Sequence, residues 1–272
     1  MAAKKKSALT LRDIRWYGRK PDTPDQRDYL FQIEHPRAVL RTASLPASVD
    51  LRDKFPKCYD QLQIGSCVGN ACAGAFAYML KNENLRTFKG SRLFVYYNAR
   101  AIEGNIKSDS GCEIRDGVKV LAKLGIPPET KWPYKIAKFA AKPPASAYTA
   151  ALTHEALTYS RVDANGDPLQ LQQALAAGFP VIIGISVYAS FETDAVASSG
   201  DVPVPEQSEQ MLGGHALVAV GYYSDVPGKE LTFIVRNSWG PAWGDEGYGH
   251  IPASYLTNPD LASDFWVLSA VT

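Results

Sequence analysis

The order of hydrophobic and polar positions divides the chain into two parts. From Cys67 to about Asn82, apolar residues recur at helical spacing, which predicts a mostly buried helix. Two further helical patterns follow: SRLFVYYNARAIEG from Ser91, and RDGVKVLAKLG, which ends at Gly125 before an Ile-Pro-Pro stop. Residues 45–150 are therefore predicted to form a mainly helical lobe.

After residue 150 the pattern changes to short runs rich in β-branched and aromatic residues. DPLQLQQALAAGFP predicts one short helix, and the strand-like runs are PVIIGISVY, HALVAVGYY, LTFIVRNSW, GYGHIP and DFWVLSAV. Their spacing predicts an antiparallel sheet or barrel over residues 151–272. The intervening stretch Ala189–Gly214 is typical of a long loop at a functional rim. The predicted fold class is α+β.

Composition narrows the classes of partner. The chain has 272 residues, of which 46% are hydrophobic, so it can bury a large core in one domain or two lobes. A formal net charge of +1 favours neither a nucleic-acid nor a membrane partner, and no apolar run approaches the ~18 residues of a membrane span. The basic start has no apolar h-region after it, so we expect no signal peptide and either a cytoplasmic location or leaderless export. We expect a monomer.

Charge is concentrated at the start of the chain. Residues 1–44 contain ten Lys/Arg and five Asp/Glu, whereas the remainder carries a net charge of −4. This basic extension also contains three prolines and the aromatic residues Trp16, Tyr17, Tyr29 and Phe31. It could dock on the acidic body through charge, or it could remain a solvated, partly disordered tail.

Two cysteines in DQLQIGSCVGNACAGAFA are candidates for chemistry. Cys67 follows Gly-Ser and begins the predicted helix, where the helix dipole favours an anion. A thiol there that faces an imidazolium can have its pKa lowered by several units. Cys72 lies more than a turn further in and shares the apolar pattern, so we expect it to pack in the core.

A thiolate nucleophile needs a base, a group that orients the base, and donors for an oxyanion. His215 begins an apolar strand after two glycines, and the amide oxygen of Asn237 could hold the second ring nitrogen. Gln61 could aim its NH₂ group at an oxyanion together with the Cys67 N–H, a contribution of about 10²–10³ in rate. The remaining histidines are expected to have packing or surface roles: His35, His154 and His250.

These residues lie in four sequence blocks that resemble the papain-like cysteine peptidases. The blocks are Gln61, GSC at 65–67, GHALVAVGY at 214–222 and NSWGPAWGDEGY at 237–248, and their order is the family's order. SVDLRDKFP at 48–56 also resembles the mature amino terminus of such enzymes, and other segments are most similar to a compact bacterial branch. The resemblance extends from about Leu45 to the end of the chain.

The resemblance implies a two-lobed fold, a helical lobe and an antiparallel β-barrel lobe with a cleft between them. It implies that Cys67 is the nucleophile, His215 the acid/base, Asn237 its orienting partner and Gln61 the oxyanion donor, with Trp239 shielding the Asn–His hydrogen bond. The implied activity is cysteine-type endopeptidase, through a thioester, on protein or peptide substrates. No metal or cofactor is expected, since no cluster has ligand spacing. An acyl transferase or deamidase with the same triad, or a non-catalytic binding protein on this scaffold, is the alternative.

Several positions depart from the family pattern. Ile64 replaces a cysteine, Val68 an aromatic residue, and Gly214 the Asp or Asn that often precedes the histidine. The longer interval between the predicted His and Asn implies an extended hairpin at about Ser224–Glu230. Substrate preference is therefore not implied by the resemblance.

Two further hypotheses follow from the resemblance. In the family, the cysteine equivalent to Cys112 pairs with the one that Ile64 replaces, so we hypothesise a disulfide to Cys58, with free thiols as the alternative. Papain-like enzymes are commonly made with an inhibitory segment. Residues 1–44 lack its long helical pattern, but we expect part of them to occlude the active site until displaced or cut near Thr42–Leu45.

Overall fold

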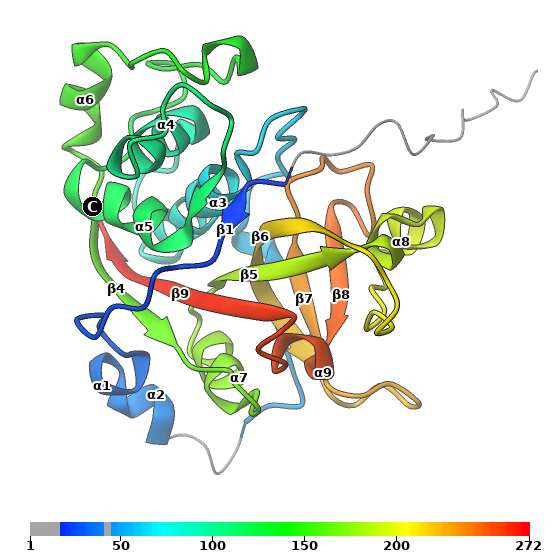
Figure 1. Ribbon diagram of the computed structural model, residues 1–272. Helices are drawn as coiled ribbons and strands as arrows, with labels where there is room; N and C mark the ends of the chain where they lie inside the picture. The colour runs from blue at the N-terminus through cyan, green and yellow to red at the C-terminus, as the bar shows by residue number, and fades with distance from the viewer. Residues whose placement is uncertain (1–16, 41–44) are drawn as a thin grey trace, which may run out of the picture.

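A computed structural model describes residues 17–40 and 45–272. It has the predicted α+β architecture, in which helices gather on one side and an antiparallel sheet on the other (Figure 1). Trp16 lies outside the described residues. So does the predicted cut site near Thr42–Leu45, except for Leu45 itself. Within residues 17–40 and 45–272, no helix has the length and apolar character needed to cross a bilayer.

The helical side is built around α3 (Cys67–Asn82), which is the helix predicted from the sequence. Every residue from Cys67 to Leu80 is buried, so α3 is a core helix along most of its length. The two other predicted helices are also confirmed, as α4 (Arg92–Ile102) and α5 (Ile114–Lys123). The Ser91 hydroxyl caps α4 by accepting a hydrogen bond from the Phe94 N–H.

The shorter helical elements surround these three. They are α1 (Phe31–Glu34), α2 (Pro36–Leu40), η2 (Arg52–Lys54), η3 (Ile136–Lys138), α6 (Ala145–Ala151), α7 (Leu169–Ala176), η4 (Ala189–Glu192), α8 (Asp194–Ser199) and α9 (Ala253–Leu256). Of these, α7 is the short helix predicted in the second half. The predicted loop Ala189–Gly214 contains η4 and α8.

The sheet has seven strands in the order β4–β9–β5–β6–β7–β8, with β2 paired to β6. Their bounds are β2 (Ser48–Asp50), β4 (Ala156–Val162), β5 (Val181–Tyr188), β6 (Met211–Tyr223), β7 (Thr232–Arg236), β8 (Tyr248–Pro252) and β9 (Ala262–Val271). Every pairing in this sheet is antiparallel. The five predicted runs correspond to β5 to β9, and β6 begins four residues before its predicted start because Met211–Gly214 pair with β5. The β6–β7 connection is the expected extended hairpin.

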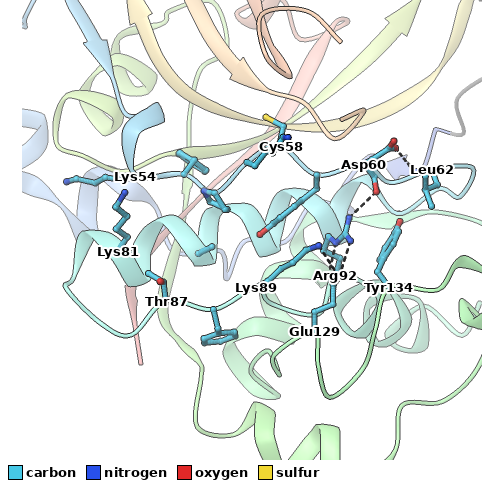
Figure 2. Close-up of a pocket in the computed structure, with 16 residues that line it drawn as sticks. Lys54, Cys58, Asp60, Leu62, Lys81, Thr87, Lys89, Arg92, Glu129 and Tyr134 are labelled. Carbon is cyan, nitrogen blue, oxygen red and sulfur yellow. Dashed lines mark hydrogen bonds and ion pairs between the residues drawn. The ribbon is translucent and has the colours of Figure 1, made fainter. Parts of the chain in front are cut away.

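The outer side of α3 borders a cavity of about 950 Å³ (Figure 2). Its wall combines cationic and aromatic side chains, among them Lys89 and Arg92, which lie over the ring of Tyr59. None of the five side chains expected to act in catalysis or to support it lines this cavity.

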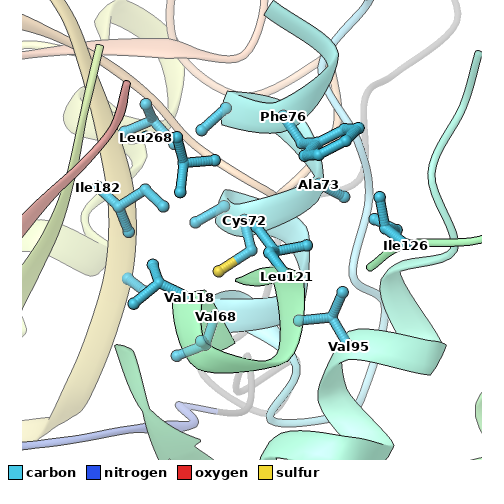
Figure 3. Close-up of a cluster of buried hydrophobic side chains, with 14 of the residues drawn as sticks. Val68, Cys72, Ala73, Phe76, Val95, Val118, Leu121, Ile126, Ile182 and Leu268 are labelled. Atoms are coloured by element: carbon cyan, nitrogen blue, oxygen red, sulfur yellow. The ribbon is translucent and has the colours of Figure 1, made fainter. Parts of the chain in front are cut away.

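The inner side of α3 packs into a buried cluster that joins the two lobes (Figure 3). Cys72 and Val68 lie in it beside Val118 of α5, and Ile182 of β5 contributes from the sheet. A Cβ atom at Gly117 of α5 would meet a Val68 methyl at 2.7 Å and the Cys72 sulfur at 2.9 Å. Val68 is therefore a tightly packed core residue, and the prediction that Cys72 packs in the core is confirmed.

The predicted disulfide between Cys58 and Cys112 is wrong. All four cysteines are free and buried. The Cys58 sulfur accepts a hydrogen bond from Arg236 Nη1 of β7 at 2.8 Å, so it faces the sheet. Cys112 begins β3 (Cys112–Glu113) at the end of the loop before α5, on the helical side. The Cys58 sulfur is therefore held at β7, whereas Cys112 lies on the short strand that pairs with Arg19 of the N-terminal extension.

The described part of the N-terminal extension crosses both lobes. Its strand β1 (Arg19–Lys20) lies between the helices and β6 (Figure 1) and pairs in parallel with β3. Further along, the Arg161 N–H of β4 donates to the Tyr29 carbonyl at 2.7 Å. Residues 17–40, termed the arm below, thus follow the junction of the lobes and then cover β4.

Candidate active site

The predicted nucleophile begins the central helix. Cys67 is fully buried at the first position of α3, and the backbone N–H of Val68 faces its sulfur. The N–H of Ala216, the residue after His215 on β6, faces the same sulfur. The structure therefore brings the start of α3 and the start of the apolar run of β6 together across the lobe junction.

His215 and Asn237 lie side by side on neighbouring strands. The His215 Nε2 is 2.9 Å from the Asn237 Oδ1. The same oxygen accepts the backbone N–H of Ser238 at 2.7 Å, which identifies it as the acceptor atom of the amide. Because Oδ1 can only accept, the Nε2 atom carries the proton, and Nδ1 is the ring atom left for proton exchange.

Trp239 covers this pair. Its ring stacks on His215 with a centroid separation of 4.9 Å and an interplanar angle of 27°. Trp243 and Phe191 pack against Trp239 from behind, at 5.6 and 5.5 Å. Burial of the His215–Asn237 hydrogen bond under an indole excludes water that would compete for it.

Gln61 is held by its backbone and its side chain. Its N–H donates to the Ser238 carbonyl at 2.8 Å, and its Oε1 accepts from the Ser238 hydroxyl at 2.6 Å. Its Nε2 donates to the Ile64 carbonyl at 3.0 Å. The Tyr134 hydroxyl donates to the Gln61 carbonyl at 2.7 Å. These bonds fix the amide beside the loop that leads to Cys67.

The other three histidines have packing roles, as predicted. His35 packs against the rings of Phe31 and Phe179, which also contact each other, and its Nε2 is 2.8 Å from the Ser269 hydroxyl. His154 packs on Phe88 at 4.3 Å, and His250 lies 5.9 Å from the ring of Tyr223.

Gly18 of the arm lies directly over the nucleophile. Its N–H faces the Cys67 sulfur, and its carbonyl accepts the Cys112 N–H at 2.8 Å. A Cβ atom at Gly18 would meet the Gly65 carbonyl oxygen at 1.7 Å, and one at Gly111 would meet the Gly18 oxygen at 2.1 Å. The three glycines allow three backbones to meet at van der Waals distance.

The neighbours of Gly18 occupy the two sides of this point. Tyr17 lies edge-on to His215 at 6.2 Å and to Trp239 at 6.3 Å, and its hydroxyl donates to Glu192. Arg19 is buried on the other side. A Cβ atom at Gly214 would meet the Arg19 carbonyl at 2.3 Å, so the glycine that departs from the family pattern makes room for the arm.

Burial determines the protonation of the nucleophile in this arrangement. It raises the pKa of the Cys67 thiol to about 11, although the N–H groups of Ala216, Gly18 and Val68 act in the opposite direction. The lowered pKa expected from the helix terminus is therefore absent while the arm is docked. The reason is that the covered sulfur is fully desolvated.

The arm is anchored by buried charges beyond Gly18. Arg19 pairs with Asp264, and the N–H of Asp22 donates to the same Asp264 carboxylate at 2.9 Å. Asp22 also accepts from Trp266 Nε1 at 2.8 Å. Burial, together with the nearby Asp264 carboxylate, raises the pKa of Asp22 to about 6. Arg115 of α5 donates to Asp28 of the arm at 3.0 Å.

The sequence signalled the arm only through its charge and aromatic residues. The contact residue Gly18 and the anchor Asp264 carried no signal, because each owes its position to segments far apart in the chain. In the described residues, no group of three or more His, Cys, Asp or Glu side chains is arranged to hold a metal ion.

Comparison with protein families gives one match over most of the chain. The model described as papain family cysteine protease matches residues 45–263. An uncharacterized peptidase C1-like protein of Acanthamoeba polyphaga mimivirus is 38% identical over 277 residues, covering 94% of this chain and 87% of that protein. A cathepsin B-like protein of Giardia intestinalis is 29% identical, covering 79% and 72%.

A solved structure is similar over the full length. The crystal structure of xylellain, a cysteine protease from Xylella fastidiosa, superimposes with a TM-score of 0.85 at 38% sequence identity. The match covers 98% of this chain and all of that one, so it includes the arm as well as both lobes.

Proposed function

Because the chain belongs to the papain family of cysteine proteases, we propose that it is an endopeptidase with Cys67, His215 and Asn237 as its triad. The observation that carries the proposal is the buried His215–Asn237 hydrogen bond of 2.9 Å. It lies next to Ala216, whose backbone N–H faces the Cys67 sulfur. A base oriented by an amide next to a helix-terminal thiol is the arrangement that acyl transfer requires.

The chemistry proceeds in two halves. His215 Nδ1 takes the thiol proton as the Cys67 sulfur bonds to the scissile carbonyl carbon, and the oxyanion that forms is stabilised by the Cys67 N–H and Gln61. His215 then gives a proton from Nδ1 to the leaving amine as the C–N bond breaks. A water molecule that transfers its proton to His215 attacks the thioester, and the C–S bond breaks to release the acid. Asn237 holds the His215 ring through Nε2 during both halves, and Trp239 shields the His215–Asn237 hydrogen bond from water.

We further propose that the arm keeps this site latent. The N–H group of Gly18 faces the Cys67 sulfur, while the Gly18 carbonyl oxygen accepts a hydrogen bond from the Cys112 N–H. The Gly18 carbonyl oxygen is therefore directed to Cys112, which supports the proposal that the arm lies in the site without being cleaved at this peptide bond. The raised pKa of the buried Cys67 adds a second cause of low reactivity.

The test is product analysis by mass after incubation with an unlabelled protein substrate. Chain cleavage is expected, and both Cys67→Ala and His215→Ala should lower its rate by about 10³-fold or more. His154→Gln, which changes a packing histidine, serves as the matched control. A one-dalton shift or a ligated product would indicate a deamidase or acyl transferase instead. Peptide binding with no turnover, even in an Arg19→Ala chain whose arm has lost its buried ion pair with Asp264, would indicate a non-catalytic binding protein.

A further inference from the structure

The cavity on the outer side of α3, termed the α3 groove below, follows most of that helix. Leu62, shortly before Cys67, lines one end, and Lys81 lines the other end in the last turn of α3 (Figure 2). Lys81 follows Cys67 by fourteen positions, which is about 21 Å along a helix axis. An extended chain covers that distance with about six residues. The groove is therefore long enough for a peptide segment.

Cations outnumber carboxylates in the α3 groove. Five of the sixteen residues that line it are Lys or Arg, and only Asp60 and Glu129 are acidic. The cations are Lys54, Lys57, Lys81, Lys89 and Arg92. Their surplus exceeds the net charge of +1 of the whole chain, so positive charge is concentrated on this face of the molecule.

The cations differ in how far they are neutralised along the groove. Glu129 pairs with Lys89 and with Arg92, each at 3.1 Å, toward the end that is nearer the active site (Figure 2). At the opposite end, Lys54 donates to a side-chain amide oxygen at 2.8 Å and Lys81 to a backbone carbonyl at 2.7 Å. Within residues 17–40 and 45–272, neither of these two lysines pairs with a carboxylate. Their charges are therefore available to an anionic ligand.

The wall of the groove also contains a buried donor. The Tyr59 hydroxyl forms no hydrogen bond within the described part of the chain, and the residue is 6% exposed. Lys89 and Arg92 flank its ring at 5.5 and 4.9 Å. Burial raises the pKa of Tyr59, so the hydroxyl keeps its proton. A ligand oxygen in the groove would supply the acceptor that this buried donor lacks.

The groove begins beside the part of the cleft that receives the leaving amine. Asp60 and Leu62, which line its near end, are the two neighbours of Gln61 in the chain. Asp60 also pairs with Trp239, whose ring stacks on His215. His215 is the residue that protonates the leaving amine in the proposed reaction. A substrate that continues beyond its scissile bond on this side is therefore led toward the α3 groove.

We propose that the α3 groove is an exosite for an acidic segment of a protein substrate, placed about six residues or more after the scissile bond. Asp60 and Glu129 disfavour acidic residues close to the cleft, whereas Lys54 and Lys81 attract them further along. A nucleic-acid strand fits this distribution less well, because it carries a phosphate at every repeat. The inference rests on the proposed function, since it concerns the substrate of the same enzyme.

The kinetic experiment uses the full chain and two substrates that share one cleavable sequence, taken from the product analysis above. Their tails carry a cluster of Glu or of Gln from about the sixth residue after the scissile bond. The measured quantity is kcat/KM for the Glu substrate divided by that for the Gln substrate, in which the fraction of molecules with a displaced arm cancels. We expect a ratio of about 10–100, the range for hydrogen bonds to charged groups. Placing the cluster directly after the scissile bond should abolish this advantage.

A double variant tests the far end of the groove. Lys54→Gln combined with Lys81→Gln should reduce the ratio at least fivefold. Lys107→Gln combined with Lys142→Gln changes two exposed lysines elsewhere on the helical lobe and alters the net charge equally, so it is the matched control. A ratio near one in the parent chain, or a ratio that the groove variant leaves unaltered, would overturn the inference.

A binding measurement separates this inference from the proposed function. No residue of the arm lines the groove, so the Cys67→Ala chain is used with its arm in place. Fluorescence polarisation compares labelled Glu and Gln tails that lack the cleavable sequence. Tighter binding of the Glu tail, weakened by salt and lost in the Lys54→Gln, Lys81→Gln chain, supports the exosite even if no peptide is ever cleaved.

Two results of this binding measurement would contradict the inference. Equal affinity for the two tails, or no detectable binding of either, would remove the exosite while leaving peptidase activity possible. A single-stranded oligouridylate that binds as tightly as the Glu tail and displaces it would show a general polyanion surface instead of a site for acidic peptides.

Discussion

The two ends of the docked arm are held in different ways. Tyr17 and Gly18 are held mainly by shape, since Gly18 meets Gly65 and Gly111 at backbone contact and Tyr17 packs edge-on to two rings. Residues 19–28 are held by buried charges, among them the Arg19–Asp264 pair. Tyr17 and Gly18, the blocking end, cover the nucleophile. Residues 19–28, the anchoring end, fix the arm beside it.

This difference separates blocking from anchoring. Close backbone contact is insensitive to pH and salt, but it tolerates no added atom. Buried ion pairs tolerate small shape changes, but they fail when one partner is removed or changes protonation. Opening of the site should therefore respond to steric change at one end and to charge and pH at the other.

The largest effect is expected from removing the charge at the anchoring end. Arg19→Ala leaves Asp264 short of a partner in the docked state, and breaking a buried pair costs about 3–5 kcal/mol. The initial rate on a peptide without basic residues should rise by on the order of 10² or more, until all molecules are open. An unchanged rate in a folded protein would show that the charged end does not hold the arm.

The next effect comes from the blocking end. Gly18→Ala places a Cβ atom 1.7 Å from the Gly65 oxygen, so one of the two backbones must move. Overpacking of this kind costs about 1–3 kcal/mol, which corresponds to a rate increase of roughly 5–150-fold on the same peptide. Unlike the Arg19 variant, this one should retain the pH dependence described next. If its rate and its pH profile both match those of the parent, Gly18 does not restrict access to Cys67.

Anchoring should weaken as pH rises. The pKa of Asp22 is raised to about 6 in the docked arm, above its ordinary value of 3.8. A raised carboxyl pKa means that its contribution to docking is fully present below the ordinary value and is lost as pH rises through about 6. The groups that face Asp22 are Asp264, Arg115 and Trp266.

The measurement is the fraction of Cys67 alkylated in a short pulse between pH 5 and 7.5. It is divided by the corresponding fraction in a Gly18→Val chain, in which the added side chain hinders docking of the arm, so that the ratio reports docking alone. The ratio should rise with pH in the parent, and Asp22→Asn should flatten that rise. A ratio that falls with pH in the parent would contradict the assignment.

The smallest effect is expected from an exposed pair in the same part of the arm. Arg27 pairs with Asp25, two residues away, and its side chain is 89% exposed. Surface pairs contribute about 0–1 kcal/mol, so Arg27→Ala should alter the peptidase rate by less than about twofold. A large change would mean that charge along the whole arm, rather than its buried part, controls the site.

Local patterns predicted much of the fold. The helix at α3 and the five strands β5–β9 were predicted because periodicity and β-branched runs report burial of one face or of a whole strand. Strand β4 and the pairing of β2 with β6 were not predicted, since edge pairing depends on partners distant in the chain. The disulfide prediction failed because spacing along the chain does not say which residue a cysteine side chain faces.

The residues of the candidate site also divide into those that local sequence predicts and those whose role depends on tertiary contacts. Cys67, His215, Asn237 and Gln61 lie in motifs that local sequence carries, and the structure brings the histidine and asparagine into contact. Asp264 was missed because its role arises from a bulge and a φ of 61°, neither of which has a residue-type signature in this chain. The high pKa of Cys67 was missed because burial by another segment is a tertiary property.

The most direct test of the account is the rate of iodoacetamide labelling of Cys67 as a function of pH, followed by peptide mapping, in the parent chain and in Arg19→Ala. The account predicts slow labelling of Cys67 below pH 8 in the parent and fast labelling in the variant, with the fast phase abolished by an added His215→Ala. Slow labelling in both chains, at the rate of the core residue Cys72, would contradict the claim that the arm covers a nucleophile paired with His215.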